Sequence, residues 1–180
     1  MTPAQRKAAE AIINGPRGAL YGPFIPLLRS PELMNTAQAM GEYLRYHSAI
    51  GERLSELVIL IVARRWTQQV EWAIHEPIAR QAGVAPNVVA AIAAGRRPSP
   101  MAADEELVYD FCGELIANQS VSDAMYARAV ARFGEQGVID LVGVVGYYTL
   151  LAMVMNTART APPAPAKGAA PVEPLRPFPQ

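Results

Sequence analysis

Glu56 is a carboxylate on an otherwise apolar side of a predicted helix. In RLSELVILIVARR its neighbours at i+3, i+4 and i+7 are Ile59, Leu60 and Ala63. Burial without a partner raises the pKa of a carboxylate toward the working pH, which suits a proton-transfer group. An ion pair with Arg53, three residues earlier, or with an arginine of another helix would explain the same position.

Glu71 and His75 form a second pair of residues that can transfer protons. They stand four apart in QVEWAIHEPIARQAG, so their side chains lie on one face of a helix. An imidazole beside a carboxylate can exchange a proton near neutral pH. The same spacing is also common for a structural histidine or a surface pair, and both interpretations stay open at this point.

A metal site is a further interpretation of these oxygen and nitrogen donors. The pattern is neither HExxH nor the paired Glu-x-x-His of di-iron bundles, and the other histidine, His47, belongs to a different predicted helix. We therefore predict no metal and no cofactor. The single cysteine, Cys112, lies in an apolar stretch and is predicted to be a buried hydrophobic residue rather than a nucleophile.

The elements that must position these residues are helices. The apolar set Leu54, Leu57, Val58 and Ile61 follows the spacing of a core-packed helix. We expect helices at 31–50, 52–65, 70–82, 86–95, 103–117, 122–133 and 135–156. Residues 21–31, with three prolines and a glycine, are predicted to be ordered but irregular. No alternation of apolar and polar residues is long enough to propose a sheet, so the predicted fold class is all-α.

Charge and hydropathy exclude several kinds of partner. The 16 basic and 16 acidic residues balance, so no electrostatic footprint for nucleic acid or an anionic membrane exists. Residues 138–155 are apolar and just long enough to span a bilayer, but Asp140 and the lack of flanking basic clusters favour a buried helix. Without a secretory h-region and with one cysteine, the chain is predicted to be cytoplasmic.

The C-terminal segment differs in composition from the rest of the chain. It holds seven of the 16 prolines and almost no large apolar residue before Leu175. We predict a helical domain at 1–156 and a Pro-rich extended tail at 157–180. The tail is either disordered or an arm that docks on a neighbouring subunit through Leu175 and Phe178.

The run at 52–83, ERLSELVILIVARRWTQQVEWAIHEPIARQAG, resembles the core of the carboxymuconolactone decarboxylase family, which includes the alkylhydroperoxidase-D-like proteins. The likeness extends to YGPFIPLLRSPEL at 21–33 and GVIDLVGVVGYYTLLAMVMN at 137–156. It implies an alkylhydroperoxidase-D-like helical fold and assembly into a dimer, trimer or hexamer. The apolar helix at 138–155 gives a physical reason to expect burial at or near such an interface.

The resemblance also implies which reaction is lost. In the peroxidase branch a glutamate is followed by a CxxC pair and a histidine, which match Glu56, then Gln68 and Glu71, then His75. Both thiols are missing, so hydroperoxide reduction by that route is excluded unless another thiol substitutes. The remaining groups resemble the decarboxylase side of the family, where a muconolactone-type acid loses carbon dioxide without a cofactor.

We therefore predict a cofactor-independent lyase or isomerase of aromatic-compound catabolism, acting on a small carboxylated or lactone-like metabolite. His75 or Glu71 would protonate the dienolate carbon left by decarboxylation, while Glu56 tunes and orients the pair. The alternatives are a non-catalytic ligand-binding or scaffold protein, and residual peroxidase chemistry through Cys112.

Five further residues are candidate substrate contacts. The aromatic residues expected to line an apolar cavity are Tyr21, Phe24, Trp72 and Tyr148. Arg53 would hold a substrate carboxylate through its planar guanidinium fork. Each of the five can instead be a core or structural residue.

Overall fold

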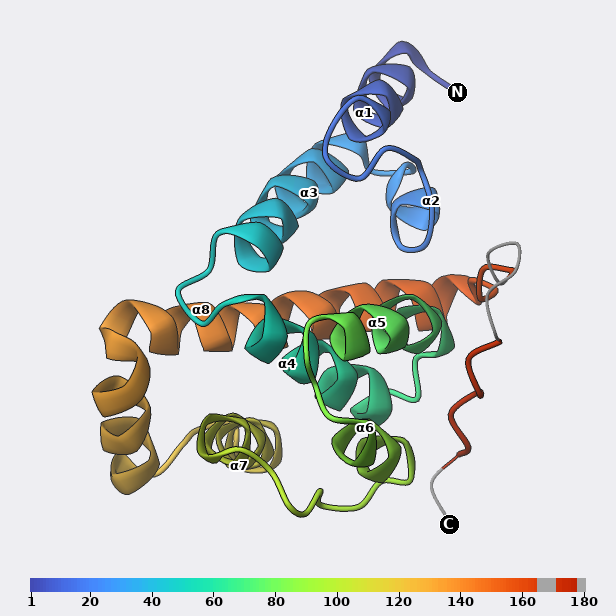
Figure 1. Cartoon of the computed structure of the whole chain (residues 1–180). Coiled ribbons are helices and arrows are strands. Elements are labelled where there is room, and N and C mark those ends of the chain that lie inside the picture. Colours follow the sequence, from blue (N-terminus) through green and yellow to red (C-terminus); the bar gives the residue numbers. More distant parts are fainter. Residues whose placement is uncertain (165–170, 178–180) are drawn as a thin grey trace.

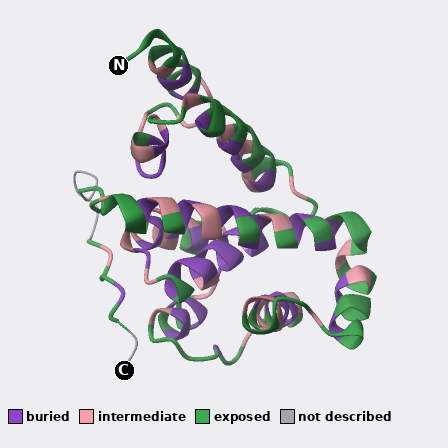
Figure 2. Ribbon diagram, turned by 180° about the vertical axis from the view of Figure 1, so that it is seen from behind, coloured by how far each residue is buried: buried purple, intermediate pink, exposed green. Residues whose placement is uncertain are grey.

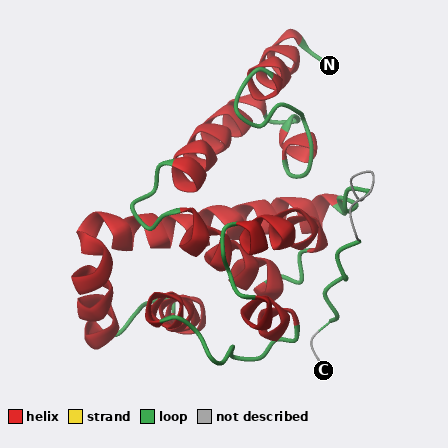
Figure 3. Cartoon of the chain, viewed as in Figure 1, coloured by secondary structure: helices red, strands yellow, loops and turns green. Residues whose placement is uncertain are grey.

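The computed structural model describes residues 1–164 and 171–177, and this part of the chain is helical without strands (Figure 3). Its helices are α1 (Pro3–Ile13), α2 (Phe24–Leu27), α3 (Pro31–Tyr46), α4 (Glu52–Arg65), α5 (Gln69–Gln81), α6 (Pro86–Ala93), α7 (Ala103–Asn118) and α8 (Asp123–Ala158). The predicted all-α class is confirmed.

Helix α4 is the centre of the core. It contacts α3, α5, α6, α7 and α8, and most of its residues are buried (Figure 2). The apolar residues on both of its predicted stripes are buried, Leu57 and Leu60 fully, except for the partly buried Ile61. Because Glu56 lies next to Leu57 and one helical turn before Leu60, the fold places its carboxylate in the protein interior.

Helix α8 consists of two arms that meet at a sharp bend (Figure 1). Gly134 lies at the bend with φ 70° and ψ 172°, a left-handed conformation that glycine adopts without steric cost. The predicted helices at 122–133 and 135–156 correspond to these two arms.

The longer arm of α8 packs as a core helix. Among the helices of the described residues, only α8 is long and apolar enough to cross a membrane. Of the residues in its most apolar 18-residue stretch, 56% are buried inside the protein. Its outer face leaves Ile139 and Met153 exposed, at 68% and 43%. Self-association through this face stays a prediction.

Helix α3 ends four residues before the predicted position. The backbone N–H of Ala49 donates to Oδ2 of Asp140 at 2.8 Å, and the Tyr43 hydroxyl lies 3.1 Å from Oδ1 of the same carboxylate. Asp140 belongs to α8, so a tertiary contact takes the hydrogen bond that would have continued the helix.

The N-terminal part of the chain is more helical than expected. Helix α1 was not predicted, although Thr2 and Gln5 form a capping box ahead of it and Pro3 occupies its first turn. The irregular segment at 21–31 contains the single turn α2. Helices α1 and α2 pack on α3, and α2 also contacts α8. Helices α1, α2 and α3 with their connections therefore form an N-terminal layer above α8 (Figure 1).

Residues 171–177 of the tail run in extended form along the same chain. The Gln69 side chain donates to the carbonyl of Leu175 at 2.8 Å and accepts its N–H at 2.9 Å, and Leu175 is 4% exposed. Arg64 Nη1 donates to the Arg176 carbonyl at 2.6 Å. Leu175 therefore docks on its own chain in this single-chain structure. Docking of the tail on a neighbouring subunit stays a prediction, and Phe178 lies outside the described residues.

Candidate functional site

A small cavity lies between the N-terminal layer and the helices α5 and α8. The residues that line it are Arg17, Tyr21, Pro23, Phe24, Arg45, Glu71, Ile74, His75, Tyr147, Tyr148, Leu151 and Met155. Its volume of about 30 Å³ has room for roughly one water molecule. The two residues that α5 contributes to its chemistry, Glu71 and His75, lie one helical turn apart, as their spacing predicted.

Glu56 lies behind the cavity and orients His75. Its Oε2 is 2.7 Å from Nδ1 of His75, and its Oε1 is 3.6 Å from Nη2 of Arg45. Glu56 is 2% exposed and His75 6%. Because a carboxylate can only accept, we assign the imidazole proton to Nδ1, which leaves Nε2 as the nitrogen that can accept a proton from a ligand.

The ion pair predicted as an alternative role for Glu56 is also present. Its partner is Arg45 of helix α3 and not Arg53. Glu56 thus both holds the imidazole and partly compensates a guanidinium charge.

Glu71 is a buried carboxyl group with no hydrogen-bond partner among the described residues. Glu71 is 3% exposed, and neither oxygen of its carboxyl group accepts or donates a hydrogen bond within the described part of the chain. Desolvation raises the pKa of Glu71 well above 4.5. The group therefore keeps its proton to a higher pH than an exposed glutamate does, and it can act as an acid.

This raised pKa gives a prediction for stability. Above about pH 4.5 and up to the raised pKa of Glu71, the folded protein binds more protons than the unfolded chain, so the free energy of unfolding falls as pH rises. The favourable contribution of protonated Glu71 to the free energy of unfolding is complete below that pH range and lost above it. The amide of Glu71→Gln does not titrate. We therefore expect the difference in melting temperature, variant minus wild type, to become more positive as pH increases.

The measurement is thermal unfolding followed by circular dichroism across acidic to alkaline pH. Glu76→Gln is the matched control, since Glu76 lies on the same helix and pairs with Arg80 outside the cavity. A constant difference in melting temperature between Glu71→Gln and wild type would contradict a buried, proton-binding Glu71.

Two adjacent tyrosines of α8 complete the cavity wall. The Tyr148 ring meets His75 edge-on with centroids 5.2 Å apart, and Tyr147 packs on Tyr148 in the same way at 5.2 Å. Burial raises the pKa of Tyr147 to about 12, although the positive charges of Arg17 and Arg45 oppose the rise. Its hydroxyl thus remains a proton donor. The Arg17 side chain lies near enough to lower the pKa of this hydroxyl by a hydrogen-bond contact, although no well-aligned hydrogen bond joins the two described side chains.

Two predicted substrate contacts do not line this cavity. The guanidinium of Arg53 pairs with Asp104 and Glu105 at the start of α7, with both distances at 2.7 Å. Trp72 is 2% exposed and faces a different cavity, between α5, α6 and the tail. The physical reason is that Trp72 follows Glu71 directly, so it points about 100° around the helix.

The other predicted contacts are brought together as expected. Tyr21, Phe24 and Tyr148 all line the cavity. Sequence reasoning missed Arg17 and Tyr147, and it anticipated Arg45 only as an unspecified arginine of another helix. No local pattern marks Arg17, since it lies in the connection between α1 and α2.

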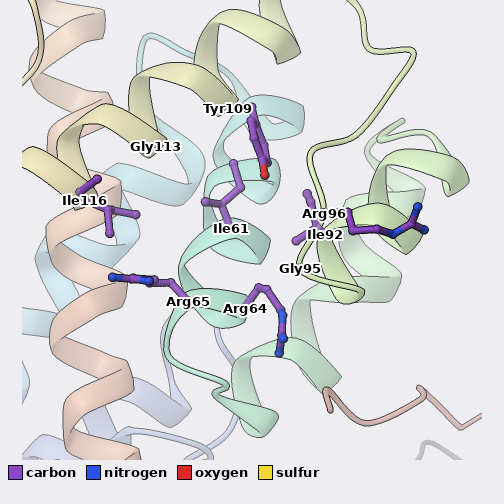
Figure 4. Close-up of a pocket in the computed structure, with 10 residues that line it drawn as sticks. Ile61, Arg64, Arg65, Ile92, Gly95, Arg96, Tyr109, Gly113 and Ile116 are labelled. Atoms are coloured by element: carbon purple, nitrogen blue, oxygen red, sulfur yellow. The ribbon is translucent and has the colours of Figure 1, made fainter. Parts of the chain in front are cut away.

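A larger pocket of about 220 Å³ lies between α4, α6 and α7 (Figure 4). It is lined by Arg64, Arg65 and Arg96 together with apolar residues, but no acidic residue or histidine lines it. The three arginine side chains extend in different directions (Figure 4). Arg64 donates to the tail carbonyl of Arg176. Because these groups do not converge on one point, we place the candidate site in the smaller cavity.

Neither a metal cluster nor a reactive thiol adjoins the site in the described part of the chain. No group of three or more His, Cys, Asp or Glu side chains there is arranged to hold a metal ion. Cys112 is fully buried in α7 and does not line the cavity, and burial raises its pKa to about 12. Its thiol therefore does not form a nucleophilic thiolate near neutral pH.

Comparison with solved structures identifies the fold. An uncharacterized peroxidase-related protein from Silicibacter sp. TM1040 superposes with a TM-score of 0.71 at 16% identity, over 91% of this chain and 88% of the other. An uncharacterized peroxidase-related protein from Ralstonia eutropha JMP134, described as an alkylhydroperoxidase AhpD core, gives 0.73 at 16% identity, over 88% and 85%. The fold is that of the alkylhydroperoxidase-D-like proteins.

Sequence comparison adds nothing to this assignment, since no protein-family model matches the chain and no curated protein is significantly similar to it. Within the alkylhydroperoxidase-D-like fold, Gln68 is a structural cap. Its side-chain oxygen accepts the backbone N–H groups of Val70 and Glu71 at 2.5 and 3.1 Å, and its Nε2 donates to Asn156 at 3.0 Å. The position matched to the first cysteine of the peroxidase branch thus begins helix α5.

Proposed function

We propose that this protein is a cofactor-independent lyase or isomerase that acts by proton transfer on a small carboxylated or lactone-like metabolite. The observation that carries the proposal is the joint placement of Glu71 and His75 in one small cavity. Glu71 has a raised pKa, and His75 is oriented by Glu56. An acid and a base are thereby available at the same pH.

In a decarboxylation, the bond between the carboxylate and the adjacent carbon breaks and carbon dioxide leaves. The bonding electrons pass into the conjugated system as a dienolate. Glu71 then donates its proton to a dienolate carbon and is reprotonated from water. In an isomerisation, Nε2 of His75 removes a proton from carbon, and Glu71 returns one to a second carbon.

Thiol-dependent peroxidase activity is the second candidate, because the two similar structures named above are described as peroxidase-related. That reaction needs one thiolate to attack the peroxide and a second thiol to resolve the product. The chain has one cysteine, and its thiol is buried away from the cavity. Proton transfer through Glu71 and His75 is therefore the better-supported proposal.

The test is a screen of carboxylated lactones and dienoic acids with the purified full-length protein. Carbon dioxide release and uptake of solvent deuterium into the organic product are measured in parallel. We expect at least one acid to show deuterium uptake that depends on the protein. Thiol-dependent hydroperoxide consumption that alkylation of Cys112 abolishes would instead favour the peroxidase.

A further inference from the structure

Buried polar atoms without partners gather around the candidate site. Five such atoms in the described part of the chain belong to residues that line the cavity: Nε of Arg17, Nε of Arg45, both carboxyl oxygens of Glu71 and the hydroxyl of Tyr147. Buried polar groups in folded proteins are almost always hydrogen-bonded. Their concentration in one cavity indicates a surface built to bind a polar group.

The charges in the cavity define the sign of that group. Arg45 is partly compensated by Glu56, at 3.6 Å. Arg17 lies over the ring of Phe24, 4.8 Å from its centroid, and forms no ion pair with any carboxylate of the described residues. Glu71 favours its neutral form because it is buried. The lining therefore keeps about one uncompensated positive charge, which a single negative charge would neutralise.

We propose that Arg17 and the hydroxyl of Tyr147 bind a carboxylate group of the substrate. The guanidinium offers a planar fork of N–H donors that matches a carboxylate, and the tyrosine adds an O–H donor. This proposal rests on the proposed function and names the substrate class of the same site. Arg17 takes the role that the sequence suggested for Arg53, whose own guanidinium is occupied by two acidic side chains.

The aromatic walls indicate the shape of the molecule that carries the carboxylate. Phe24 and Tyr148 line the cavity together with Tyr21, and such rings pack well against a flat, conjugated ligand. A cavity of about 30 Å³ is too small for an organic acid, so the ligand must displace part of the lining. Arg17 and Phe24 lie in the segment before α3 and contact each other, so we expect them to move together.

The test uses benzoate and the neutral, similarly shaped benzamide as probes, with binding measured by isothermal titration calorimetry at constant ionic strength. Wild-type protein is expected to bind benzoate at least about tenfold more tightly than benzamide, as a charge-assisted contact predicts. Arg17→Gln should lose most of that preference, and Arg17→Lys should keep part of it. Tyr147→Phe should weaken benzoate binding about three- to tenfold.

Arg29→Gln is the matched control, because Arg29 is an exposed arginine of the same N-terminal layer and does not line the cavity. It should bind benzoate like the wild type. Thermal unfolding followed by circular dichroism establishes that each variant is folded. If Arg17→Gln does not fold, the folded Arg17→Lys variant is used for the comparison. Equal preference in wild type and a folded Arg17 variant would overturn the proposal, as would no preference in the wild type.

Binding and turnover separate this proposal from the proposed function. Arg17-dependent binding of benzoate without turnover of any acid would support the carboxylate subsite and count against the lyase or isomerase. Deuterium uptake that persists unchanged, with the same KM, in Arg17→Gln would support the reaction and overturn the subsite.

Discussion

Glu71→Gln is expected to lower kcat about 100- to 10,000-fold for any acid that the protein turns over, the usual range for losing a positioned general acid. Glutamine keeps the shape of the side chain, which is 3% exposed, but it has no carboxyl proton to donate. Binding of substrate should change much less than kcat, since the reaction step and not the cavity shape is altered. The measurement is steady-state kinetics of carbon dioxide release or deuterium uptake.

His75→Ala should cause a loss of similar size in deuterium uptake by isomerisation, because it removes the imidazole that takes the proton from carbon and that Glu56 orients at 2.7 Å. Glu76→Gln is the control with the same chemical change on the same helix, and its kcat should match the wild type because its carboxylate pairs with Arg80. Full turnover in both Glu71→Gln and His75→Ala would remove the basis for the proposed reaction.

Gly41→Ala is expected to destabilise the fold more than any other glycine substitution in a helix. A Cβ at this position of α3 would lie 2.1 Å from the hydroxyl oxygen of Tyr147 and 2.4 Å from its Cζ. Overpacking of this kind costs about 1–3 kcal/mol or more, which exceeds the gain of up to about 1 kcal/mol in helix propensity. We expect the melting temperature to fall by about 3–10 °C.

Gly113→Ala provides the matched control for this prediction. Gly113 also lies inside a helix, α7, but a Cβ there would meet no atom within 4 Å. Its melting temperature should stay the same or rise slightly, because alanine is the better helix former. If both variants melted alike, the close packing of Tyr147 against α3 would be contradicted.

The same substitution connects packing to the site. Helix α3 carries Arg45, and Tyr147 lines the cavity beside it. A shift of α3 away from α8 would move Arg45 relative to Glu56, so Gly41→Ala should also weaken activity in the protein that remains folded.

Local sequence was sufficient for the helices of the core. Helix α4 begins and ends at the predicted residues, 52 and 65, because its two apolar stripes and the preceding Gly51 act within a few residues. The same holds for the break at Gly134, whose left-handed conformation depends on one residue. Glu71 and His75 could be placed together because four residues along one helix fix their separation.

Tertiary packing decided which other groups meet this pair. Arg17, Arg45 and Tyr147 come from three segments far apart in the sequence, and they line one cavity only because α2 and α3 pack on α8. The choice of partner for Arg53 was equally non-local, since its two carboxylates come from α7. Spacing along a helix determines which side chains share a face, but only the packing of helices determines what that face meets.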